Sequence, residues 1–185
     1  MTARRLLIQA DGGSRGNPGT AGYGAVVLDA VTGEVLAEVS EAIGHATNNV
    51  AEYSGLVAGL RAAGGLAPGA PAEVRMDSKL VVEQMSGRWK IKHPDLRPLA
   101  AQASQAAQVL GRVTYTWVPR ERNTHADRLA NQAMDAAGEG VSAPGGTGIA
   151  RGAGGKAARG AGKGRRNDSG AGSGARRPSG TAGLW

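Results

Sequence analysis

The last quarter of this 185-residue chain has almost no bulky apolar side chain before Leu184 and Trp185, which limits what can fold. Residues 138–185 hold 16 of the 31 glycines, mixed with alanine, serine and arginine. Such a segment cannot bury enough apolar surface to offset the entropy lost on ordering. We therefore expect one domain in residues 1–137 and a disordered, basic, Gly/Ala/Arg-rich tail in residues 138–185.

The positive charge lies mainly in the tail. The chain has a net charge of +7, and residues 138–185 carry eight basic and two acidic groups, or +6, which leaves +1 for residues 1–137. The absence of cysteine excludes disulfides, zinc–thiolate sites and cysteine nucleophiles. No apolar run approaches the roughly 20 residues of a membrane span, and Asp11 follows the N-terminus too closely for a signal peptide. We expect a cytoplasmic protein with no membrane partner.

The first part of the domain has the pattern of three strands. Residues 4–10, 22–28 and 34–43 are short apolar or alternating runs joined by short connections, which is typical of an antiparallel meander. Between the first two runs, the segment Gly12–Gly19 has four glycines and the pair Asn17-Pro18, a composition typical of a turn.

The remainder of the domain alternates helices and strands. From Asn48 the apolar spacing changes to a helical period. The predicted helices span residues 48–64, 79–85, 94–110 and 124–137, with Ser78 as the N-cap of the second. The predicted strands span residues 72–76 and 112–118. Because the last two strands follow helical crossovers, they are expected to run parallel to the first. The predicted fold is α/β, a mixed five-stranded sheet with three antiparallel and then two parallel strands, flanked by helices.

Four acids occur where such a sheet collects functional groups. Asp11 and Asp77 are predicted to end two parallel strands at one edge, and Glu52 and Asp127 lie near the starts of two helices. Clustered carboxylates must be protonated or hold cations, and oxygen ligands alone suit Mg²⁺ or Mn²⁺. Asp11 before two glycines is also an ordinary turn former, and Glu52 and Asp127 also fit helix-capping patterns. Spacing alone leaves both interpretations open.

The sequence motifs around these acids resemble those of the type 1 ribonuclease H family. The motifs are Asp11–Gly19 with Gly22–Gly24, Thr47–Tyr53, Met76–Lys79 and Trp117–Ala130. They occur in the family's order, cover essentially all of residues 1–137 and omit the tail. The chain is similar to the actinobacterial domains of this family, which are often joined through a low-complexity segment to a phosphatase-like domain, and we expect this chain to be without that domain.

The resemblance implies a ribonuclease H-like fold and an endonuclease that cuts the RNA strand of RNA–DNA hybrids, leaving 5′-phosphate and 3′-hydroxyl ends. Asp11, Glu52, Asp77 and Asp127 would hold two Mg²⁺ ions about 4 Å apart, for which Mn²⁺ can substitute. In this scheme Asp11 bridges the ions, one ion activates water for in-line attack, and the other stabilises the leaving 3′-oxygen.

The resemblance also implies a substrate-binding set. Glycines would let the backbone approach the nucleic acid, asparagines would contact the minor groove, where 2′-hydroxyls distinguish RNA, and a threonine would bind a DNA phosphate. These residues are Gly12, Gly13, Asn17, Thr47, Asn48 and Asn49. Trp89 lies in a short basic patch that is either a hybrid contact or a solvated turn. The protein is expected to act as a monomer.

One departure from the family concerns the loop before the last acid. Many members have a histidine there, whereas residues 119–123 here have none. Arg120 or Arg122 would then serve near the phosphate, or Glu121 would approach the metals. His125 lies two residues from Asp127, so a helix directs the two side chains to different faces.

The same residues are compatible with two other classes of function. One is a different enzyme on the same fold, such as a DNA junction resolvase or a 3′–5′ exonuclease. The other is a catalytically inactive hybrid-binding module. The Asp-Gly-Gly-Ser and Thr-Asn-Asn motifs argue against the first class. The retention of four mutually repelling acids argues against the second.

Overall fold

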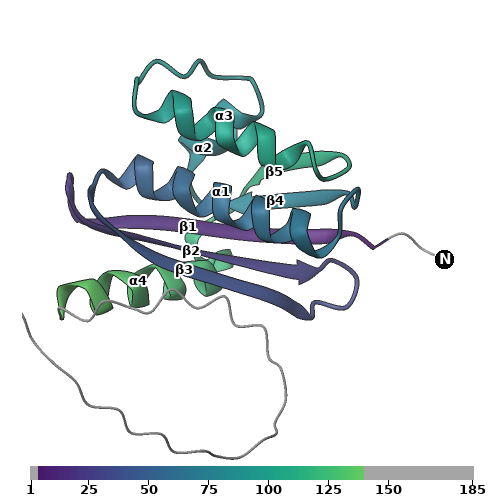
Figure 1. The fold of residues 1–185 in the computed structure, drawn as a ribbon, viewed down its shortest axis with the longest axis horizontal. Coiled ribbons are helices and arrows are strands. Elements are labelled where there is room, and N and C mark those ends of the chain that lie inside the picture. The colour runs from purple at the N-terminus through teal and green to yellow at the C-terminus, as the bar shows by residue number, and fades with distance from the viewer. Residues whose placement is uncertain (1–3, 140–185) are drawn as a thin grey trace, which may run out of the picture. The chain divides into compact units, whose positions relative to one another are not determined.

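The computed structural model describes residues 4–139, which form one sheet flanked by helices (Figure 1). The predicted tail lies outside the described residues, apart from Gly138 and Glu139 at its start. Between residues 4 and 139, no helix is long and apolar enough to cross a membrane.

The five strands form a single mixed sheet. They are β1 (Leu6–Gly16), β2 (Gly19–Asp29), β3 (Val35–Ala46), β4 (Ala72–Met76) and β5 (Val113–Trp117). Their order in the sheet is β3-β2-β1-β4-β5. β2 runs antiparallel to both β1 and β3, whereas β4 runs parallel to both β1 and β5. The predicted topology is confirmed.

Helices pack on both faces of the sheet (Figure 1). They are α1 (Asn48–Leu66), α2 (Lys79–Met85), α3 (Leu96–Ala107) and α4 (Thr124–Gly138), with the 3₁₀ turn η1 (Arg120–Arg122) before α4. Tyr23 and Gly24 are consecutive strand residues and therefore face opposite sides of the sheet. Gly55 of α1 lies against Tyr23, whereas Leu129 of α4 lies against Gly24. The helices α1 and α4 thus cover opposite faces, and α3 packs against α1.

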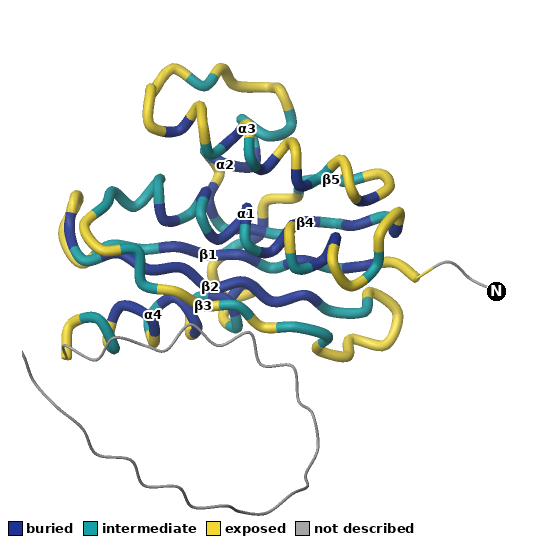
Figure 2. Tube along the Cα trace, viewed as in Figure 1, coloured by how far each residue is buried: buried dark blue, intermediate teal, exposed yellow. Residues whose placement is uncertain are grey.

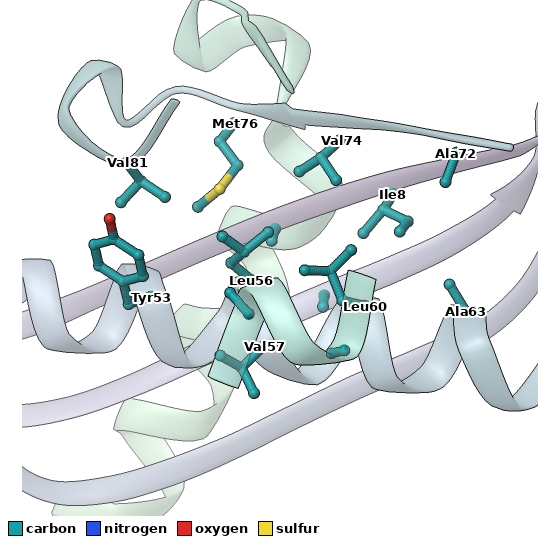
Figure 3. Close-up of a cluster of buried hydrophobic side chains, with 14 of the residues drawn as sticks. Ile8, Tyr53, Leu56, Val57, Leu60, Ala63, Ala72, Val74, Met76 and Val81 are labelled. Carbon is teal, nitrogen blue, oxygen red and sulfur yellow. The ribbon is translucent and has the colours of Figure 1, made fainter. Parts of the chain in front are cut away.

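The main hydrophobic core lies between the sheet and α1 (Figure 3). Ile8 and Val74 project from the strands onto Leu56 and Leu60 of α1, and none of the four is exposed. A buried side chain of this size contributes about 1.5–3 kcal/mol relative to an exposed one. Figure 2 shows the central strands as the most continuously buried part of the chain. The sheet is therefore a rigid platform for side chains at its edge.

The prediction of a loop from Gly12 to Gly19 is wrong, because most of this segment is β-strand. β1 continues to Gly16 and β2 begins at Gly19, so the turn consists of Asn17 and Pro18. Gly12 is required by helix packing, since a Cβ at this position would lie 2.1 Å from the carbonyl carbon of Ala51 in α1. Glycine here permits a close approach of helix and strand.

Other element boundaries move by a few residues. The helix predicted over residues 94–110 spans Leu96–Ala107. It ends early because the N–H groups of Gln108 and Leu110 donate to carbonyls three residues back, at 3.2 and 3.1 Å, which closes tighter turns. The third strand extends to Ala46, three residues beyond its predicted end.

Candidate active site

Two of the predicted acids, Asp11 and Asp77, lie at equivalent positions in the register of two adjacent parallel strands. The register pairs Gln9 of β1 with Arg75 of β4, and Asp11 and Asp77 each follow two residues later. The prediction that Asp11 ends its strand is wrong, because the β1–β2 hairpin continues to Gly16. The two carboxylates nevertheless lie near each other where β4 ends, and the charge of Asp77 contributes to raising the pKa of Asp11.

Asp11 is the most buried of the four acids, with 8% of its surface exposed. The backbone N–H of Gly12 donates to its carboxylate. Burial, followed by the charges of Asp77, Asp127 and Glu52, raises the pKa of Asp11 to about 7. The ionised form of Asp11 is therefore costly unless a cation is present.

A buried asparagine holds Asp77 in place. Asn123 is fully buried, and its Nδ2 donates to Asp77 Oδ1 at 2.8 Å and to the Ala10 carbonyl at 3.0 Å. Trp117 Nε1 also donates to the backbone carbonyl of Asp77 at 3.1 Å. Asn123 therefore joins the middle of β1, at the residue before Asp11, to Asp77 at the end of β4.

Glu52 projects from the second turn of α1 and is held by two donors. Ser78 Oγ donates to its Oε2 at 2.5 Å, and Asn48 Nδ2 donates to its Oε1 at 3.0 Å. Burial raises the pKa of Glu52 to about 7, the charge of Asp77 adds to this, and the two hydrogen bonds oppose it. Its side chain is thus oriented before any ligand binds.

Asp127 lies in the first turn of α4. The Arg120 guanidinium pairs with its Oδ1, and Asn131 Nδ2 donates to its Oδ2 at 3.1 Å. The hydrogen bond with Asp127 and its charge, followed by the charges of Asp11 and Asp77, raise the pKa of Arg120. One cation of the chain is therefore already associated with the acidic cluster.

Neither Glu52 nor Asp127 caps its helix. The N-cap of α1 is Thr47, whose Oγ1 accepts from the Val50 N–H at 3.3 Å. The N-cap of α4 is Asn123, which makes no side-chain capping bond. The structural alternative of a capping pair is therefore not supported for either acid.

The chemistry of the four acids fits a divalent cation of the magnesium type. Asp11 is a buried carboxylate with three like charges around it, and oxygen donors without sulfur are the ligands such ions prefer. Within residues 4–139, no three acidic or histidine side chains already form a closed ligand set. Instead, Ser78, Asn123 and Arg120 bind oxygens of Glu52, Asp77 and Asp127. An ion would share or replace these partners.

The predicted substrate-binding residues fall into two groups. Gly12 is buried beneath α1, where the Ala51 backbone leaves no space for a Cβ, so packing explains this glycine without a substrate. A Cβ on Gly13 would meet only the end of the flexible Met134 side chain, at 3.1 Å, so packing does not by itself require glycine there. The other group joins the hairpin turn to the start of α1, where Asn17 Oδ1 accepts from the Asn48 N–H at 3.2 Å. Thr47, Asn48 and Asn49 are all partly exposed there. This surface adjoins Glu52, because Asn48 also binds it.

The remaining predicted residues lie on exposed segments. Trp89 is 46% exposed in the loop after α2. Arg122 and Glu121 are exposed on η1, and the backbone carbonyl of Arg122 accepts from Gln9 Nε2 at 3.4 Å. His125 pairs with Glu38 of β3, which agrees with its predicted separation from Asp127.

Sequence reasoning missed the roles of Asn123 and Ser78. Ser78 was identified as an N-cap, and its Oγ does accept from the Val81 N–H at 3.4 Å, but its bond to Glu52 was not foreseen. Asn123 was noted only as part of a motif. An asparagine one residue before a helix normally indicates a cap. In this chain, only the packing of α4 on the sheet reveals that it is buried.

Comparison with known proteins supports the same reading of the fold. A family model described as reverse transcriptase-like matches residues 9–133. A bifunctional protein of Mycobacterium tuberculosis is 63% identical over 139 residues, which cover 75% of this chain and 38% of that protein. The chain thus spans about two fifths of this relative.

Solved structures are similar over the same region. The N-terminal ribonuclease H domain of that mycobacterial protein has a TM-score of 0.72 and 62% identity, covering 76% of this chain and all of that one. LC11 ribonuclease H1 in complex with an RNA/DNA hybrid has a TM-score of 0.68 and 40% identity, covering 71% and 98%.

Proposed function

The chain belongs to the ribonuclease H family, and from this premise we propose that it is an endoribonuclease that hydrolyses the RNA strand of RNA–DNA hybrids. The observation that carries the proposal is the level placement of Asp11 and Asp77 on adjacent parallel strands, with Glu52 and Asp127 beside them. A site that gathers three acids around the buried carboxylate of Asp11 is suited to cations and phosphate, not to an anionic substrate alone.

The four acids are proposed to hold two Mg²⁺ ions, for which Mn²⁺ can substitute. When bound, the ions would supply an activated water and neutralise charge at the scissile phosphate, giving 5′-phosphate and 3′-hydroxyl ends. The chain's own part is preorganisation. Asn123 fixes the Asp77 carboxylate, and Ser78 and Asn48 fix that of Glu52.

We assign hybrid recognition to the surface formed by Asn17, Thr47, Asn48 and Asn49. Their amide and hydroxyl groups match the 2′-hydroxyls and phosphates of a widened minor groove. Trp89 and its neighbouring cations in the loop after α2 would add a second contact. Arg120 is assigned an auxiliary role at the phosphate because it already lies against Asp127, and Arg122 a weaker one. Action as a cytoplasmic monomer is part of the same proposal.

The decisive experiment is cleavage of an end-labelled RNA–DNA hybrid in Mg²⁺. We expect internal cuts in the RNA strand, with activity reduced at least about a thousandfold by Asp11→Asn or Asp77→Asn. Chelation with EDTA should abolish cleavage, and added Mn²⁺ should restore it. The variant Glu34→Gln, at an exposed position in the connection between β2 and β3, serves as the matched control.

Results other than internal cleavage of the RNA strand would identify a different function. Hybrid binding without cleavage in either metal indicates a binding module. Cleavage of four-way DNA junctions, or stepwise removal of 3′ nucleotides with the hybrid's RNA left intact internally, indicates another nuclease on this fold. Any of these results would contradict the proposed activity.

A further inference from the structure

The loop of residues 86–95, between α2 and α3, carries cations and an aromatic side chain in an exposed arc (Figure 2). Arg88, Trp89, Lys90 and Lys92 are all exposed. A ten-residue connection of this kind is usually mobile unless its backbone is bonded to the rest of the protein. This loop is bonded at its start, middle and end.

The start of the loop is fixed by the end of α2. Gly87 has φ +76°, a left-handed conformation that suits glycine. The N–H of Gly87 donates to the Gln84 carbonyl and that of Arg88 to the Glu83 carbonyl, each at 3.0 Å. These two bonds form a Schellman motif. At the far end, Arg97 Nε donates to the Ile91 carbonyl at 3.2 Å.

The middle of the loop is held by the Gln84 side chain. Its Nε2 donates to the Lys90 carbonyl at 3.3 Å, and its Oε1 accepts from the Tyr53 hydroxyl at 2.8 Å. A backbone carbonyl can only accept, so the amide nitrogen must face Lys90, and the amide oxygen then faces Tyr53. The two bonds therefore select one orientation of the Gln84 amide.

The inner end of this series of hydrogen bonds, at Tyr53, is held rigidly. Tyr53 is fully buried, and Figure 3 shows its ring among core side chains with the hydroxyl oxygen at its upper tip, on the side of Val81 in α2. Tyr53 directly follows Glu52 in α1. The loop is thus tied through two side-chain bonds to the helix that carries one of the four acids.

We propose that the Tyr53–Gln84–Lys90 chain holds this loop as a preformed contact surface for the RNA–DNA hybrid, which makes Gln84 a positioning residue for substrate binding. The inference rests on the proposed function for its substrate. A tethered loop loses less conformational freedom on binding, so Lys90 and Trp89 contribute more of their contact energy to affinity. The tether touches no acid, so it should affect binding and leave the chemical step unchanged.

The test uses three variants of the full chain. Gln84→Met removes both bonds at similar size, Tyr53→Phe removes only the inner bond, and Gln102→Met alters a glutamine on α3 that binds Arg61 and serves as the matched control. The dissociation constant for a labelled hybrid is measured in EDTA, where no cleavage occurs, and KM and kcat are measured in Mg²⁺. Thermal unfolding confirms that each variant is folded.

We expect Gln84→Met to raise both the dissociation constant and KM roughly 3- to 10-fold, with kcat within twofold of wild type. Tyr53→Phe should show a smaller change in the same direction, and Gln102→Met none. In a Lys90→Ala background, Gln84→Met should have less effect, because the loop cation that it positions is gone.

The inference is overturned if Gln84→Met lowers kcat and leaves KM unchanged, or if both tether variants bind like wild type. It is also overturned if the wild-type chain does not bind the hybrid. Binding that depends on Gln84 in a wild-type chain that cannot cleave would sustain the tether while rejecting the proposed nuclease activity.

Discussion

The buried position of Asp11 destabilises the metal-free fold but suits the proposed metal site. Its carboxylate is buried beside three other acids, so its ionised form raises the free energy of the folded chain when no cation is bound. In an unfolded chain the same group is hydrated and far from the others. Its environment therefore fits the proposed role in cation binding better than a role in stabilising the fold.

Asp11→Asn should therefore stabilise the metal-free chain. Because the pKa of Asp11 is raised to about 7 in the fold, the penalty from its charge grows as pH rises from about 4 to 7 and is complete above 7. We expect a gain in unfolding free energy of about 1–3 kcal/mol at pH 8 and a smaller gain at pH 5. Thermal unfolding in EDTA at both pH values measures this. Glu34→Gln, exposed and outside the cluster, should change little. A lower melting temperature for Asp11→Asn at pH 8 would contradict the argument.

The acids themselves could be predicted from the sequence, whereas their partners could not. Asp11 and Asp77 are found by following two apolar runs to the polar residues after them. Asn123 binds Asp77 and Ser78 binds Glu52, each from a segment distant in the chain from its acid. Their side chains have several equally good local partners, and only the packed structure selects one.

At the scale of elements, periodicity predicted every strand and α-helix, because each buries one face and its apolar spacing records that face. The one substantial error was the glycine-rich segment after Asp11. Glycine permits turns and also permits close approach of two backbones, and a single sequence does not distinguish these uses. In this fold α1 lies so close to β1 that Gly12 has no space for a side chain.

Gly12→Ala should consequently be severe although alanine is the smallest replacement. A Cβ placed 2.1 Å from the Ala51 carbonyl carbon requires α1 to move away from the sheet. We expect a loss of about 2–3 kcal/mol or more in unfolding free energy, measured by urea denaturation.

Gly65→Ala is the matched control for this substitution. Gly65 lies in α1 with no neighbouring heavy atom within 4 Å of an added Cβ. Its replacement should stabilise the chain slightly, by up to about 1 kcal/mol. Equal effects at Gly12 and Gly65 would show that helix packing does not explain the glycine at position 12.

At the scale of the whole molecule, charge and fold are separated along the chain. Residues 140–185 hold eight basic residues and one acidic residue, or +7, and the remaining 14 basic and 14 acidic residues balance. The described part of the chain thus has no general attraction for nucleic acid. Its proposed recognition depends on particular groups, whereas the remainder would attract any polyanion.

Truncation after Glu139 should separate these two contributions. This position follows the last residue of α4, so we expect the melting temperature and hybrid cleavage at low salt to be preserved. Affinity should fall modestly, and the dependence of log Kd on log salt should become less steep, since fewer counterions are released on binding. Binding titrations at several KCl concentrations measure the slope. Complete loss of cleavage at low salt would show that residues beyond Glu139 belong to the folded domain.

The parallel pairing of β1 with β4 also determines which changes in chain length the protein can accept. Four residue pairs, from Leu6 with Ala72 to Gln9 with Arg75, set the level of the two aspartates that follow. Insertions between α1 and β4 lengthen only a surface connection and leave that level unchanged. An inserted residue within Ala72–Met76 would turn Asp77 toward the opposite face of the sheet. Natural length variation in proteins built like this one is therefore expected in the crossover and excluded from the short ladder beside it.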